Sequence, residues 1–81
     1  MDRKILEDNL AIAERHLTLA REHVRRQREI VEKLLRDGHG ATLSRQVLKT
    51  YEQSLALHAR EYDRLQKLHT EALQGTNTSL Q

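Results

Sequence analysis

Apolar residues recur along the first half of the chain with the alternating spacing of a coiled-coil seam. Each position follows the previous one by four or three residues in alternation, and Gln27 is the one polar member. The positions are Leu6, Leu10, Ala13, Leu17, Ala20, Val24, Gln27, Val31 and Leu34. These spacings place successive side chains on one side of an α-helix. The pattern therefore predicts a helix over about residues 3–37 that buries this side.

The second half repeats the spacing with a more polar set of residues. Its positions are Ser44, Leu48, Tyr51, Leu55, His58, Tyr62, Leu65, His69 and Ala72. No proline or glycine interrupts it, which predicts a second helix over about residues 41–74. Residues 75–81 are polar and aperiodic, and we expect them to form a flexible C-terminal tail.

A short glycine-containing turn separates the two predicted helices at residues 38–40. Gly38 stands where a helix commonly ends in a left-handed residue, a conformation that glycine adopts without steric cost. Gly40 or Thr42 is the expected cap of the second helix. The polarity of the turn is sufficient to explain His39.

So short a turn makes the helices antiparallel neighbours, and residues whose numbers sum to about 78 or 79 should lie opposite each other. This rule places Gln27 opposite Tyr51 as a polar pair. It also brings Arg28 near Glu52. The expected fold is all-α, an antiparallel two-helix hairpin that resembles a coiled coil.

A second apolar stripe remains outside the seam on the matching flanks of both helices. Its members are Ile5, Ile12, Leu19, Ile30, Leu43, Val47, Leu57 and Leu68. A lone hairpin of two helices, each about 50 Å long, is a thin rod that exposes much of what it should bury. The most economical cover is a second copy, so we expect a homodimer that forms a four-helix bundle.

Composition excludes several classes of function. The 81 residues contain no cysteine and 2% aromatic residues, which excludes disulfides and thiolate metal sites and makes a buried active site improbable. The formal charge of +2 does not demand a polyanionic partner. The opening residues are charged and no stretch approaches the roughly 20 apolar residues of a membrane span. We expect a cytoplasmic, non-enzymatic protein with no cofactor, no resident metal and no membrane contact.

Histidine is the richest chemical feature of the chain. His16 and His23 are about 10.5 Å apart along the helix axis, too far to share one ion within a subunit. His16 and Glu61 occupy matching levels, and a symmetric dimer would supply each twice. Histidine and glutamate side chains at such positions are more often hydrogen-bonded interface residues than metal ligands. We expect an interface role for His16, His23 and Glu61. His58 and His69 lie in the seam, and we expect their polar ends to tilt toward water.

Four arginines within eight residues are the best candidates for nucleic-acid contact: Arg21, Arg25, Arg26 and Arg28. Glu22, Glu29 and Glu32 interrupt this run, and no aromatic residue nearby offers stacking. A solvated face is therefore favoured over a nucleic-acid site.

The run RQREIVEKLLRDGHG at residues 26–40 is followed by VLKTYE at 47–52 and HAREYDRL at 58–65. These segments resemble a group of short uncharacterised bacterial helical-hairpin proteins, which share RQREIVxxLxRDGH before the turn and LxxxE and HxxxxxRL after it. The resemblance covers about residues 14–68. It implies a bacterial protein and brings no activity, cofactor or catalytic residue.

These observations favour a protein-interaction or scaffold module that self-associates. The expected interface consists of Ile5, Ile12, His16, Leu19, His23, Ile30, Val47, Leu57, Glu61 and Leu68. One alternative is that the same stripe binds an amphipathic helix of another protein. The other is a regulatory protein that contacts nucleic acid through the arginine run.

Overall fold

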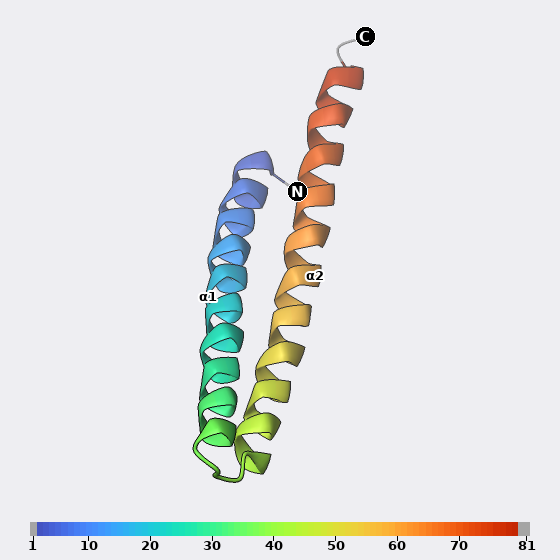
Figure 1. Ribbon diagram of the computed structural model, residues 1–81. Coiled ribbons are helices and arrows are strands. Elements are labelled where there is room, and N and C mark those ends of the chain that lie inside the picture. Colours follow the sequence, from blue (N-terminus) through green and yellow to red (C-terminus); the bar gives the residue numbers. More distant parts are fainter. Residues whose placement is uncertain (1, 80–81) are drawn as a thin grey trace.

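Two long helices joined by a short turn make up the part of the chain that the computed structural model describes, namely residues 2–79, with side chains described for residues 2–74. Helix α1 spans Arg3–Arg36 and helix α2 spans Thr42–Ser79. They lie side by side and run in opposite directions (Figure 1), in a rod of 66 × 15 × 14 Å. The predicted all-α hairpin is confirmed.

The turn begins with a hydrogen-bonded helix ending at Gly38. The His39 N–H donates to the Leu34 carbonyl at 2.9 Å, and the Gly38 N–H donates to the Leu35 carbonyl at 3.2 Å. This pair of bonds is the Schellman motif, which requires a left-handed residue between the helix and the outgoing chain. Gly38 has φ +77°, as the sequence predicts. Helix α1 ends at Arg36, one residue earlier than expected.

Replacing Gly38 with alanine should lower the free energy of unfolding by about 1 kcal/mol, because a Cβ is strained at positive φ. Steric contact adds nothing, since no heavy atom lies within 4 Å of the position a Cβ would take. Gly40→Ala is the matched control, because that site is equally open and its φ is not positive. Urea denaturation followed by circular dichroism measures both. Equal losses in the two variants would contradict this account of the turn.

Helix α2 begins one residue later than expected, and neither Gly40 nor Thr42 takes the cap position. Ala41 precedes the helix, and its carbonyl accepts the first helical hydrogen bond from the Arg45 N–H at 2.8 Å. The Ala41 side chain is buried, at 5% exposure. Burying this methyl group at the closed end of the hairpin therefore takes precedence over a capping hydroxyl.

The far end of α2 also differs from the prediction. The sequence predicts that the helix stops near residue 74 and that a flexible tail begins at Gly75, but α2 continues to Ser79. A glycine inside a helix costs about 1 kcal/mol relative to alanine and does not by itself end the helix. The chain has no proline to do so. Residues 80–81 of the predicted tail lie outside the described residues.

The core follows the predicted seam. The buried residues of α1 are Leu6, Ala13, Leu17, Ala20, Val24, Gln27 and Val31. Helix α2 contributes Leu65 as its one buried side chain within residues 42–74, and its other seam residues there are half-buried. At the open end, Leu6, Ala13 and Leu65 pack together. The seam residues of α1 are thus buried more completely than the more polar seam residues of α2.

Two ring contacts across the seam join residues that the summing rule does not place opposite each other. The His58 ring lies 5.5 Å from His16, and the Tyr51 ring lies 5.2 Å from His23. His16 lies one helical turn before Ala20, which the summing rule places opposite His58, and His23 lies one turn before Gln27, the expected partner of Tyr51. A seam side chain packs between two residues of the facing helix that are one turn apart. Its position along the helix axis therefore does not determine which of the two it contacts. The predicted pair of Arg28 and Glu52 is present at 3.3 Å.

Candidate protein-interaction face

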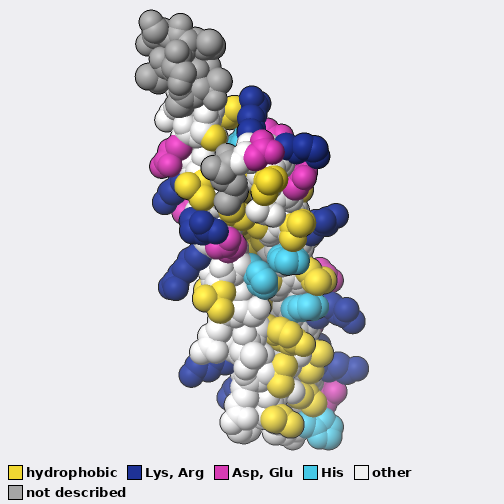
Figure 2. Space-filling view, turned by 180° about the vertical axis from the view of Figure 1, so that it is seen from behind, with side chains coloured by type: hydrophobic (Ala, Val, Ile, Leu, Met, Phe, Trp, Pro, Cys, Tyr) yellow, Lys and Arg dark blue, Asp and Glu magenta, His cyan; other side chains and the backbone are white. Residues whose placement is uncertain are grey.

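One side of the hairpin exposes large apolar side chains from both helices. We call it the apolar face, and it consists of Ile5, Ile12, Leu19, Ile30, Leu43, Val47 and Leu57. Their exposed fractions range from 37% for Val47 to 73% for Leu43. These residues flank the seam on matching sides of two antiparallel helices, so the two flanks adjoin. Figure 2 shows apolar side chains along this side of the rod.

Leu68 differs from its predicted place in the interface, and Leu35 is exposed although it was not predicted to be part of it. Leu68 is half-buried and packs against the cluster of Leu6, Ala13 and Leu65, so it contributes to the interior of the hairpin. Its position next to the seam allows this inward packing. The side chain of Leu35 is exposed at 48%. It directly follows the seam residue Leu34 and falls outside both the seam and the second apolar stripe.

Histidines gather near the middle of the apolar face. His16, His23 and His58 line a shallow depression of about 300 Å³ together with Leu19, Ala20 and Ser54. The rings of His16 and His58 are tilted by 59° at 5.5 Å. Figure 2 shows the histidine side chains with apolar side chains on both sides of them along the rod. The face therefore has a polar centre between two apolar ends.

Glu61 is paired with Arg64 of its own helix. Its carboxylate accepts two hydrogen bonds from Arg64, at 3.0 Å from Nε and 2.6 Å from Nη2. This hydrogen bonding to Arg64 lowers the pKa of Glu61 below its usual value. The His16 ring contacts His58.

His69 ties the two helices together at the open end. Its Nε2 lies 3.3 Å from Oε1 of Glu7, and the same oxygen accepts a hydrogen bond from Arg3 Nε at 3.0 Å. The hydrogen bond with His69, followed by that with Arg3, lowers the pKa of Glu7. The half-buried His69 thus turns its polar end toward an exposed partner, as predicted for the seam histidines.

The four arginines of the candidate nucleic-acid site do not share one surface. Arg21, Arg25 and Arg28 line one depression around Leu55. Arg26 lines another, beside residues that include Ile30 of the apolar face. The structure therefore divides the run that the sequence places together.

Two of these arginines are already paired with carboxylates. Arg25 forms ion pairs with Glu22 and Glu29, the latter at 2.7 Å. Hydrogen bonding to Arg25 lowers the pKa of Glu22. Arg28 pairs with Glu52 across the two helices. These carboxylates reduce the positive field that a nucleic-acid site would need.

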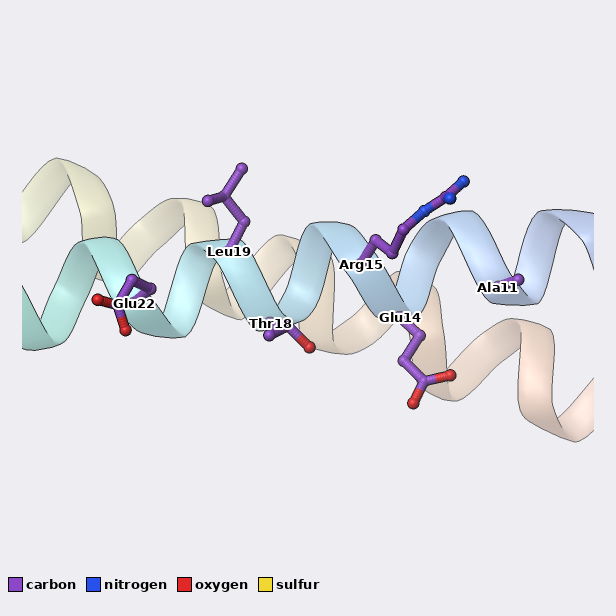
Figure 3. Close-up of a pocket in the computed structure, with 6 residues that line it drawn as sticks. All are labelled: Ala11, Glu14, Arg15, Thr18, Leu19 and Glu22. Carbon is purple, nitrogen blue, oxygen red and sulfur yellow. The ribbon is translucent and has the colours of Figure 1, made fainter.

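A further depression runs along the outer surface of α1 and has no wall from α2. Its lining residues are Ala11, Glu14, Arg15, Thr18, Leu19 and Glu22. Figure 3 shows Leu19 pointing to one side of the helix and Thr18 and Glu14 to the other. Diverging side chains on one convex helix do not enclose a ligand.

The described residues contain neither a cluster of metal ligands nor a membrane-spanning helix. Among them, no three histidine, aspartate or glutamate side chains are placed to hold a metal ion. Neither helix, over its described length, is apolar enough to cross a membrane.

Comparison of the chain with protein families, with curated proteins and with solved structures finds no match. The expected kinship with bacterial hairpin proteins stays a prediction.

Proposed function

We propose that this hairpin is a non-enzymatic protein-interaction module that self-associates through its apolar face into a four-helix bundle. The observation that supports the proposal is the row of exposed aliphatic side chains on one side of both helices. Fully burying one such side chain is worth about 1.5–3 kcal/mol relative to leaving it in water. An exposed apolar surface this extended is typical of a protein contact site.

A second copy of the chain fits this surface because the face complements itself. Ile30, Leu43 and Val47 lie toward the turn, and Ile5 and Ile12 lie toward the open end, on either side of the central histidines. A two-fold axis through the middle of the face brings the turn end of one hairpin against the open end of the other, twice. Both apolar ends are then covered by the same contact.

Sedimentation equilibrium of the wild-type chain tests the proposal. We expect a mass twice the 9.5 kDa of one chain, with dissociation on dilution. A single-chain mass at every concentration up to about 100 μM, which corresponds to a free energy of association weaker than about −5.5 kcal/mol, would contradict self-association. The same face would then be better explained as a groove for the amphipathic helix of another protein.

A further inference from the structure

The imidazole rings of His16 and His58 contact each other at the centre of the apolar face. Within the described residues neither ring has a hydrogen bond or an ion pair, whereas the ring of His69 is engaged by Glu7. His16 is exposed and His58 is half-buried, so both rings border the open depression at the centre of the apolar face. Their nitrogens are therefore available to a ligand that approaches this face.

The spacing of the two rings suits a shared metal ion. Neutral imidazole is a good ligand for zinc, copper and nickel ions. On a tetrahedral zinc ion with Zn–N bonds of about 2.0–2.1 Å, two imidazole ring centres lie about 5 Å apart. The observed separation of 5.5 Å is close to this value. The separation of the rings is therefore compatible with two imidazoles on one ion.

One hairpin supplies only half of a tetrahedral site. No third histidine, aspartate or glutamate within the described residues completes a set of ligands, and the nearby Glu61 is taken by Arg64. A stable zinc site needs three or four protein ligands. The missing ligands must then come from outside this hairpin.

We propose that His16 and His58 of two copies together bind one divalent transition-metal ion, such as Zn²⁺, at the two-fold axis of the dimer. This inference rests on the proposed self-association, because that axis passes through the middle of the face, where the histidine pair lies. The ion would join the two hairpins at the polar centre, between the apolar ends. Self-association would consequently be strengthened by the metal.

Zinc titration of the untagged chain at pH 7.5 tests the inference, with calorimetry for stoichiometry and sedimentation for mass. We expect one Zn²⁺ per two chains and a dimer dissociation constant at least tenfold lower with zinc than with EDTA. His16→Gln and His58→Gln should each weaken zinc binding at least tenfold. His39→Gln is the matched control, because His39 lies in the turn, and it should bind zinc like the wild type.

Three results would overturn the zinc site: no binding, one Zn²⁺ per chain with unchanged mass, or unaltered binding in both His16→Gln and His58→Gln. Circular dichroism establishes that the two variants remain helical. A dimer that is indifferent to zinc would remove this inference and leave the proposed function intact. A chain that stays monomeric with and without zinc would remove both. A chain that dimerises only with zinc would support the site and contradict self-association through the apolar face alone.

Discussion

Leu17→Ala is expected to lower the free energy of unfolding by about 2–5 kcal/mol, a large part of the stability of so small a protein. Leu17 is 5% exposed at the middle of the α1 seam. Truncating it removes apolar area from the interface between the helices and leaves a cavity that two stiff helices cannot easily close. Urea denaturation followed by circular dichroism, over a series of protein concentrations, measures the loss.

Leu19→Ala provides the control for this prediction. It is the same substitution two residues further along α1, at a side chain that is 54% exposed. Its effect should act through the dimer and should fade as the protein is diluted, whereas the loss in Leu17→Ala should persist at every concentration. If the two variants lose equal stability at the lowest concentration, the division of α1 into a buried seam and a separate apolar face is wrong.

Ile12→Arg is expected to raise the dimer dissociation constant at least 100-fold while preserving the hairpin. Ile12 belongs to the apolar face, and an arginine there would bring an unpaired charge into the contact in both copies. The helix itself should be unaffected, because Ile12 lies outside the seam and arginine is a good helix former. Sedimentation reports the dissociation constant, and circular dichroism reports the helix content.

Ala11→Arg introduces the same side chain one residue earlier, at an exposed position on the outer surface of α1. We expect it to associate like the wild type. Equal weakening by both arginines would indicate a general charge effect instead of a contact at the apolar face. A wild-type dissociation constant in Ile12→Arg would place the contact surface elsewhere on the rod.

The hairpin was predictable because the relevant signals are local and strong. Spacing alone identifies the buried side of α1, and Gly38 marks the end of the first helix through the backbone geometry that glycine permits. The exposed positions of Ile12 and Leu19 follow from the same period. None of these conclusions requires knowledge of how the two helices are aligned.

Other features depend on small energy differences that spacing does not encode. A seam residue has two neighbours one turn apart on the facing helix, so the contact of His58 with His16 could not be chosen in advance. The continuation of α2 past Gly75 depends on about 1 kcal/mol. The separation of Arg26 from Arg25 and Arg28 follows from helical geometry, which a count of charges along the sequence ignores.

The buried amide of Gln27 helps to fix the alignment of α1 against α2. Gln27 is 9% exposed, and its Nε2 donates to the Ser44 carbonyl at 3.0 Å instead of pairing with Tyr51. If the helices slid past each other by one turn, this hydrogen bond would be lost, and a buried donor left without an acceptor costs about 1–3 kcal/mol. Sliding would also shift every contact point on one helix relative to the other by about 5 Å. This internal hydrogen bond therefore favours one alignment of the two helices. Every copy then presents the same surface, which a symmetric dimer requires.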